Sequence, residues 1–369
     1  MDLQGQNGLD HPWRHAWRSG KGPAIVIAIA ITLFYLVLYF EDDLQGWLGF
    51  RPITPIAAAL GLPNRWFLYG LLYSVAMIGG AIRYLRKHGN SRYHQVRIGV
   101  NVAIQVALGF TLPFVMHLFG EQDIYFSYLW PLKIENFYPQ DLAHYPAYFA
   151  VYSLVASLVV APLLTLRFGK RWYCSWVCGC GGLANTFGDP WRHLTSKSTR
   201  AWRFERVSVH TVMVIAVVTT ALVVGDFFVG EHVLWIHAAA EPVRRTYGLV
   251  VGAMLAGVVG VGFYPLFGPR MWCRNFCPMA AMLGLIQKAG QFRITVKPDM
   301  CISCGNCSSY CEMGIDVRDY AQRNESFTRA SCVGCGMCAH VCPRGVLKLE
   351  SGPQIDRAAT KRHLPLVTG

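Results

Sequence analysis

The residues in this sequence that are best suited to chemistry are its thirteen cysteines, ten of which lie beyond residue 270. Eight of them form two runs with one spacing, in which two, two and three residues separate successive cysteines. Thiolates at this spacing are typical ligands of [4Fe-4S] clusters, because a tight loop supplies three and a distant cysteine completes the cage. The runs are Cys301, Cys304, Cys307, Cys311 and Cys332, Cys335, Cys338, Cys342.

The two runs are expected to exchange their last cysteines. In the two-cluster ferredoxin arrangement, the fourth cysteine of each run binds the cluster of the other run. The predicted ligands of the first [4Fe-4S] cluster are therefore Cys301, Cys304, Cys307 and Cys342. Those of the second cluster are Cys332, Cys335, Cys338 and Cys311. A zinc site is a weaker alternative because zinc favours two C-x2-C pairs, and disulfides do not suit a reducing compartment.

Four further cysteines form a repeated motif upstream of the runs. In residues 171–178 and 270–277, an arginine is followed by an aromatic residue, a cysteine and a second cysteine four positions later. If the segments are helical, both thiols of a copy share one helix face. Three interpretations stay open: a further iron–sulfur or copper centre, a reversible dithiol, or cysteines that only pack. The repetition favours metal or redox chemistry at Cys174, Cys178, Cys273 and Cys277, and leaves Cys180 as a spare thiol.

A strongly apolar chain must position these cysteines. Hydrophobic residues make up 53% of the sequence and charged residues 15%, with a mean hydropathy of +0.30, which excludes a soluble single-core protein. A membrane-spanning helix needs about 20 apolar residues, and six segments are long enough. They are 24–40, 66–84, 98–118, 147–167, 207–229 and 248–268. Segment 53–62 is too short to span and is predicted to form an interfacial or re-entrant turn.

The distribution of positive charge predicts the orientation of these helices. Of the 34 lysines and arginines, 29 lie on one side of the six spans, so both termini are expected to be cytoplasmic. The basic charge is then explained by membrane topology, and no nucleic-acid partner is expected. The predicted location is a bacterial-type inner (cytoplasmic) membrane. Aromatic residues in the outer loop 119–146 are expected to form an interfacial belt.

The predicted fold class is a polytopic α-helical membrane protein with six transmembrane helices and a C-terminal α+β ferredoxin-like domain for two [4Fe-4S] clusters. A cytoplasmic segment 1–23 precedes a membrane domain 24–289 that contains both C-x3-C motifs. The ferredoxin-like domain is expected at 290–352, and the tail at 353–369.

These features together resemble the NapH/NosR/CcoG group of membrane-bound ferredoxin-like electron-transfer proteins. The resemblance rests on the two C-x3-C copies, the second read as Cys273-x3-Cys277-Pro278, and on the two-cluster domain with residues 313–318 after its first run. The NapH-like branch is nearest, because neither a NosR-type flavin domain nor a CcoG-type Ig-like domain is found. Two positions depart from the group: Gly179 and Glu312 stand where proline is common.

The resemblance implies a membrane protein that passes single electrons between quinol or quinone, or a membrane partner, and the [4Fe-4S] clusters. It would serve a respiratory or accessory redox system, with redox proteins and the quinone pool as partners. No catalytic residue is identified, so whether it is an enzyme or the electron-transfer subunit of an oxidoreductase stays open. The alternative is a copper reductase or assembly factor, since soft thiolates favour Cu(I).

Histidines offer weaker candidates. His210 with nearby Arg206 could accept a proton at an inner quinone site, although an ordinary helix-end role is the stronger alternative. His117 and His232 could ligate a haem, but interfacial polar residues are the simpler interpretation.

Overall fold

The computed structural model describes residues 22–230 and 232–352. The predicted tail 353–369 and all but the last two residues of the predicted segment 1–23 lie outside these ranges. Six helical stretches within them are long and apolar enough to cross a membrane, which confirms the predicted number. They are Ala24–Trp47, Arg65–His88, Arg92–Leu118, Ala147–Phe168, Thr199–Val229 and Leu234–Gly262.

Three of the spans are α-helices, and the other three contain π-helical segments. The α-helical spans are α2 (Gly22–Leu48), α4 (Arg65–His88) and α12 (Thr199–Val229). The third span comprises α5 (Arg92–Val106), η1 (Ala107–Thr111) and α6 (Leu112–Leu118). The fourth comprises α8 (Ala147–Val155), η3 (Ala156–Val160) and α9 (Ala161–Phe168); the sixth comprises α13 (Leu234–Tyr247), η5 (Gly248–Val259) and α14 (Gly260–Gly262). Such π-helical segments are often found at functional sites.

Short helices connect the spans. Helix α3 (Thr54–Ala59) occupies the short segment predicted at 53–62, and its start is held by the buried carboxylate of Glu41, which accepts hydrogen bonds from the Ile53 and Thr54 amides. Helices η2 (Ile134–Phe137) and α7 (Pro139–Leu142) lie in the loop after α6. Between the fourth and fifth spans lie α10 (Arg171–Cys174), α11 (Gly179–Asn185) and η4 (Asp189–Leu194), and after the sixth lie α15 (Tyr264–Phe267), α16 (Met271–Asn275) and α17 (Pro278–Lys288).

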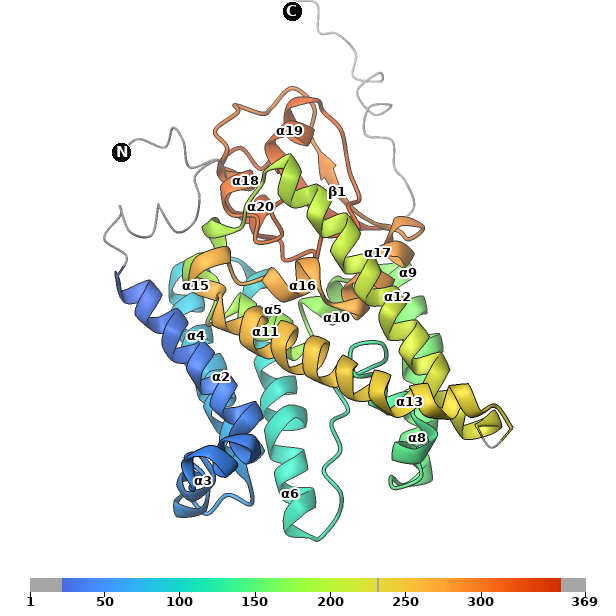
Figure 1. Ribbon diagram of the computed structural model, residues 1–369. Coiled ribbons are helices and arrows are strands. Elements are labelled where there is room, and N and C mark those ends of the chain that lie inside the picture. The colour runs from blue at the N-terminus through green and yellow to red at the C-terminus, as the bar shows by residue number, and fades with distance from the viewer. Residues whose placement is uncertain (1–21, 231, 353–369) are drawn as a thin grey trace, which may run out of the picture.

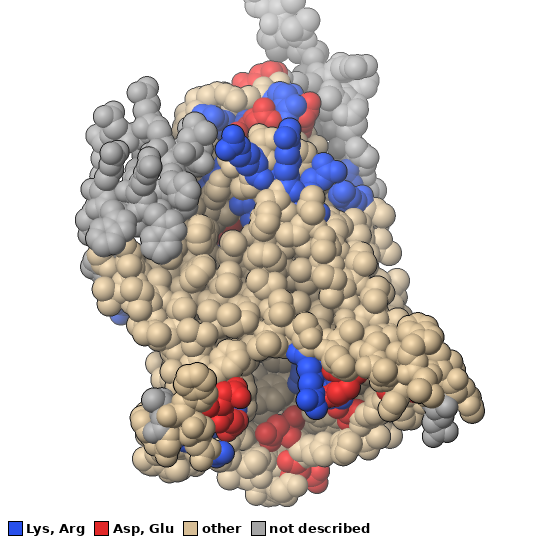
Figure 2. Space-filling model, in the orientation of Figure 1, with Lys and Arg blue, Asp and Glu red and all other residues tan. Residues whose placement is uncertain are grey.

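The C-terminal region is a small α+β unit, as predicted. Strand β1 (Phe292–Val296) pairs antiparallel with β2 (Leu347–Ser351), and Ile294 lies opposite Leu349. Between them come α18 (Asn306–Ser309), α19 (Val317–Gln322) and α20 (Met337–His340). This unit lies at one end of the membrane helices, with α15 and α16 next to it (Figure 1). In Figure 2, many blue lysines and arginines lie at that end with some acidic residues, and an uncharged band separates them from a second group of acidic and basic residues at the opposite end.

The loop after α6 differs from its prediction. It turns back into the membrane domain (Figure 1), where Tyr173 Oη donates a hydrogen bond to the Ser127 carbonyl at 2.8 Å. Trp130 Nε1 donates to Thr220 Oγ1 in α12, and Tyr138 is fully buried. The predicted interfacial belt is therefore wrong for these aromatic residues. Trp130 finds its hydrogen-bond partner on α12, as a polar group in an apolar interior requires, whereas the Tyr138 hydroxyl has none among the described residues.

Candidate functional site

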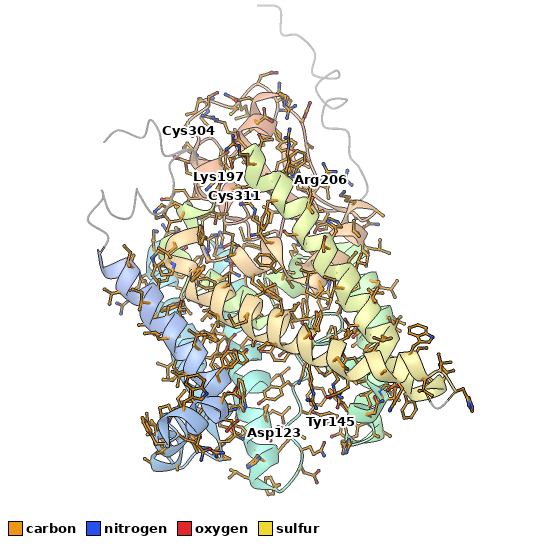
Figure 3. All side chains as sticks on the ribbon, in the orientation of Figure 1. Asp123, Tyr145, Lys197, Arg206, Cys304 and Cys311 are labelled. Atoms are coloured by element: carbon orange, nitrogen blue, oxygen red, sulfur yellow. The ribbon has the colours of Figure 1, made fainter. Side chains whose placement is uncertain are left out.

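The cysteines of the C-terminal unit fall into two groups. Three from the first run and one from the second line one cavity: Cys301, Cys304, Cys307 and Cys342. This grouping is what the predicted exchange of last cysteines requires. Cys304 is exposed near the outer surface of the unit, whereas Cys311 lies closer to the membrane helices (Figure 3).

The other four cysteines, Cys311, Cys332, Cys335 and Cys338, are half-buried and influence one another's pKa. Burial raises the pKa of the Cys338 thiol, and neighbouring Cys335, Cys332 and Cys311 raise it further. Burial likewise raises the pKa of Cys332 to about 12. Mutual effects of this kind require the thiols to be close together. The ligand assignment to two clusters remains a prediction, which this grouping supports.

The backbone around these cysteines fits a sulfur-ligated cluster. The Ile315 amide donates to Cys311 Sγ and the Val346 amide to Cys342 Sγ, each at 3.4 Å, and such bonds stabilise thiolate ligands. Helices α18 and α20 each follow a glycine with φ near +80°, Gly305 and Gly336. A Cβ atom at Gly336 would lie 2.7 Å from Tyr93 Cε1, so only glycine permits this close packing.

The two C-x3-C motifs also come together. Cys174, Cys178, Cys273 and Cys277 are all buried in one core cluster. Burial raises the pKa of Cys277, and the neighbouring thiols of Cys273, Cys174 and Cys178 raise it further. We call these four cysteines the membrane-edge cysteines. Among the described residues, no group of three or more His, Cys, Asp or Glu side chains could hold a single metal ion.

The helical arrangement suggested for each motif is wrong. Helix α10 ends at Cys174, and Cys178 directly precedes α11; Cys273 lies in α16, and Cys277 directly precedes α17. Pro278 begins α17, and the helical conformation is disfavoured for the residue before a proline. The helix is therefore interrupted between Cys273 and Cys277. Each motif therefore brings its thiols together across a turn and not along one helix face.

The surroundings of the thiols bear on the dithiol interpretation and on the role of Cys180. Without a bound metal, burial raises the pKa of Cys174 and Cys273 to about 11, which leaves them protonated and weakly reactive near neutral pH. Cys180 is not isolated: its hydrogen bond with Cys178 is the largest contribution to the raised pKa of Cys178. Cys180 follows Cys178 by two residues, and the structure shows that the two side chains interact.

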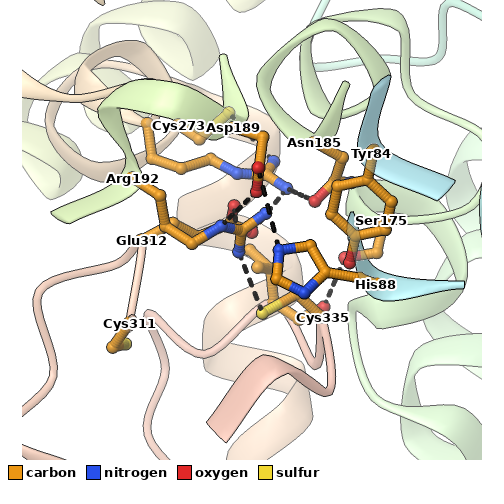
Figure 4. Close-up of polar contacts among 12 residues, drawn as sticks. Tyr84, His88, Ser175, Asn185, Asp189, Arg192, Cys273, Cys311, Glu312 and Cys335 are labelled. Atoms are coloured by element: carbon orange, nitrogen blue, oxygen red, sulfur yellow. Dashed lines mark hydrogen bonds and ion pairs between the residues drawn. The ribbon is translucent and has the colours of Figure 1, made fainter. Parts of the chain in front are cut away.

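A buried ion-pair network links the membrane-edge cysteines to the second cysteine run (Figure 4). Glu312 Oε1 accepts a hydrogen bond from Arg270 Nη2, and Glu312 Oε2 forms an ion pair with Arg192 Nη1, both at 2.9 Å. Arg270 Nη1 lies 3.8 Å from Cys273 Sγ, and Arg192 Nη1 lies 3.9 Å from Cys335 Sγ. Burial would raise the pKa of Glu312, but Arg192 and Arg270 outweigh it and the pKa is lowered.

The arginines of the repeated motif have different environments. Arg270 is fully buried in the network, whereas Arg171 bonds to Ser351 in β2 and stacks over the Phe292 ring. The repeat therefore predicts the cysteine positions better than it predicts the arginine contacts.

A second buried arginine lies near Cys335. Arg97 is fully buried, its Nη2 donates to Tyr84 Oη at 2.9 Å, and its Nε and Nη1 have no hydrogen-bond partner among the described residues. Burial raises the pKa of Cys335 and Glu312 adds to the rise, whereas Arg192 and Arg97 oppose it. An uncompensated buried cation is costly, so an anionic thiolate-ligated cluster fits this position.

The loop of the second run is docked on the membrane domain. Ser175 Oγ donates to the Val333 carbonyl at 2.7 Å, and Tyr93 Oη donates to the Gly334 carbonyl at 2.8 Å. His340, in α20, packs its ring against that of His94, with centroids 4.8 Å apart. The second run thus lies between the membrane-edge cysteines and the more exposed first run.

The weaker histidine candidates have ordinary partners. His210 Nδ1 donates to the Arg206 carbonyl within α12, and both residues line a cavity of about 630 Å³ that also reaches Cys273. His117 pairs with Asp123 at 3.2 Å, and His232 is exposed. These contacts agree with the simpler interpretations of all three residues.

An apolar cavity of about 440 Å³ adjoins the first C-x3-C motif. Its walls are the re-entrant loop at 126–129, the fourth span with part of η3, and Trp172, Tyr173 and Val177 of the motif. Lining residues on the fourth span, including Val151 and Val155, are exposed on an apolar helix and so face lipid. Ser127 is buried in this wall, and its Oγ has no hydrogen-bond partner among the described residues.

Comparison with known families assigns a class to these features. The family described as "4Fe-4S dicluster domain" matches residues 300–347. The family described as "4Fe-4S binding domain" matches residues 150–198 and 250–297, which contain the two C-x3-C motifs. Parts of the chain thus match ferredoxin-type 4Fe-4S domains, and the described residues include six apolar helices.

Individual relatives agree with this class. The chain is similar to YccM of Escherichia coli K12, named provisionally as an electron transport protein, with 27% identity over 46% of this chain and 47% of YccM. It is also similar to MauN of Paracoccus denitrificans, a methylamine utilization ferredoxin-type protein, with 28% identity over 43% of this chain and 54% of MauN. The chain thus spans about half the length of these relatives. No solved structure matches it significantly.

Proposed function

We propose that this protein passes single electrons between quinol or quinone in the membrane and two [4Fe-4S] clusters, in the manner of the NapH-like branch that it resembles. The clusters would be held by the two ligand sets predicted above. The membrane-edge cysteines would hold a further iron–sulfur cluster, and not a single metal ion, between the quinone and the second cluster. The protein would lie in the bacterial inner membrane with both termini in the cytoplasm, and a soluble redox protein would exchange electrons at the first cluster.

The observation that carries this proposal is the apolar cavity beside the first C-x3-C motif. A lipid-soluble ring can enter it from the bilayer, because exposed apolar residues of the fourth span form its lipid side. Trp172 and Tyr173 form its inner wall, and Cys174 follows them directly. The unpaired hydroxyl of Ser127 supplies the polar contact that the oxygen of such a ring requires.

The order of the sites gives the electrons a continuous route. From the cavity wall the route would reach the membrane-edge cysteines, then the second run, which is docked on the membrane domain, and finally the first run with its exposed Cys304. Oxidation of one quinol would release two electrons, one for each bound cluster, and two protons, which would pass to water. The protein's own role is to bind the ring, exclude water from the thiols and set the potentials through nearby charges.

Filling the cavity should stop quinol-driven reduction. Val155→Trp places a large ring in the cavity from its lipid side and should lower the rate of cluster reduction by quinol about tenfold or more, since the substrate ring is excluded. The rate is measured by stopped-flow absorbance with decylubiquinol and protein in lipid nanodiscs.

Val159→Trp is the matched control, because Val159 is equally exposed on the same span and does not line the cavity. Dithionite should reduce the clusters fully in both variants. If quinol fails to reduce the wild-type protein while dithionite succeeds, the proposed function is wrong.

The Ser127 hydroxyl should contribute to quinol affinity. Ser127→Ala removes one hydrogen bond to the ring and should raise the KM for quinol about threefold to tenfold, with little change in kcat. Steady-state kinetics with a soluble electron acceptor provide the measurement. Ser208→Ala, whose hydroxyl bonds to its own helix at the Phe204 carbonyl, should change neither parameter. An unchanged KM for Ser127→Ala would place the ring elsewhere.

A further inference from the structure

We infer that Glu312 is a positioning residue that couples the membrane-edge centre to the second cluster. One carboxylate holds two arginines, and each arginine contacts a cysteine sulfur of a different site (Figure 4). The inference rests on the proposed function, because it requires a redox centre at the membrane-edge cysteines.

The contact on the membrane side is made by Arg270. This fully buried side chain donates to Glu312 Oε1, to Asn185 Oδ1 at 3.1 Å and to the Cys174 carbonyl at 3.3 Å, besides its contact with Cys273 Sγ. Its guanidinium thus touches both C-x3-C motifs. Because these partners fix the orientation of the Arg270 guanidinium, its positive charge stays next to the membrane-edge thiols.

The contact on the ferredoxin side is made by Arg192. Its Nη1 reaches both Glu312 Oε2 and Cys335 Sγ, and its Nε bonds to Asp189 Oδ1 at 3.0 Å. Asp189 therefore shares Arg192 with Glu312 but makes no contact with Arg270 among the described residues. Glu312 itself directly follows Cys311, so the bridge begins one residue from a predicted ligand of the second cluster.

The charges around Glu312, Arg192 and Arg270 explain how these residues would affect both redox potentials. Among the described residues, Arg97, Arg192 and Arg270 are buried with two carboxylates as ion-pair partners, Glu312 and Asp189, which leaves positive charge for anionic thiolate-ligated centres. Adding an electron to one centre draws its arginine closer, and Glu312 then neutralises the other arginine more fully. Reduction of one centre therefore makes reduction of the other less favourable, so the two potentials depend on each other.

Glu312→Gln should shift both midpoint potentials to more positive values. It removes one negative charge beside both centres, and the reduction equilibrium of each should change about tenfold, which is 59 mV for one electron. EPR-monitored redox titration of anaerobically purified protein measures both values. Asp189→Asn should shift only the midpoint potential of the second cluster. Glu205→Gln, which removes a buried carboxylate bonded to Arg274 at 2.8 Å without a cysteine sulfur contact, should shift neither.

A second variant keeps the test valid if Glu312→Gln loses iron. Arg270→Lys retains the positive charge but cannot make the forked contacts, so Glu312 should move toward Arg192. The reduction equilibrium of the second cluster should then become several-fold less favourable. Two results would overturn the coupling: an unchanged midpoint potential of the second cluster in Arg270→Lys, or a shift in the midpoint potential of only one centre in Glu312→Gln. Iron analysis of the wild type comes first: absence of a membrane-edge centre would overturn the proposed function and this inference together, whereas a present centre with unlinked potentials would overturn the inference alone.

Discussion

Replacing the four membrane-edge cysteines by serine is expected to remove one metal centre and to leave about eight irons per chain in the ferredoxin-like domain. The four thiols are buried together, and serine hydroxyls are poor ligands for soft metal centres. Quinol should no longer reduce the two remaining clusters, although dithionite still should. Iron and acid-labile sulfide are measured on anaerobically purified protein, with EPR of the reduced sample.

Cys180→Ser is the matched control for this experiment. Cys180 lies beside Cys178 but belongs to neither C-x3-C motif, so its replacement should leave the iron content unchanged. Two outcomes would contradict the prediction. An iron content that is the same before and after the four replacements would exclude an iron centre there, and copper lost with these cysteines would favour the metal-reductase alternative.

Single replacements of the last cysteine of each run should remove different clusters. Cys342→Ser should lose about four irons from the exposed first cluster and keep the buried second cluster. Cys311→Ser should lose the buried cluster and keep the exposed one. The remaining cluster is identified by its rate of loss to an iron chelator, which should be fast where Cys304 gives access and slow for the set docked on the membrane domain, none of whose cysteines is exposed.

The opposite pairing of variant and chelator rate would show that each run binds its own cluster without exchange. Ser309→Ala, a replacement near Cys311 that removes no thiol, should keep both clusters and so controls for local disturbance.

Much of the fold follows from local properties of the sequence. The six spans were predicted because length and apolarity alone decide whether a helix can cross a bilayer. Their ends were less certain: the sixth helix begins at Leu234 and not near 248, since its polar first part with Arg244 and Arg245 continues the helix outside the apolar run. The interfacial belt at 119–146 was predicted wrongly for Trp130, because its hydrogen bond to Thr220 in α12 is a distant contact that hydropathy does not report.

The cysteines of the candidate site were equally visible in the sequence, whereas the charges around them were not. The contacts of Glu312 with Arg270 and Arg192 join residues 42 and 120 positions apart, and nothing local distinguishes these arginines from others in the basic loops. One signal was available: Glu312 stands where the resembling group commonly has proline. A carboxylate at such a position, directly after a cluster cysteine, suggests a buried cationic partner.

The docking of the second cysteine run on the membrane domain has a consequence for how the turnover rate depends on solvent viscosity. Ser175 and Tyr93 hold the loop at Val333 and Gly334, directly between the cysteines of that run. A carrier domain on a flexible tether must swing between donor and acceptor, and its turnover falls as the surrounding solution becomes more viscous. In this protein the parts of the proposed relay are already docked together, so only the arrival of mobile partners at its two ends should respond to viscosity.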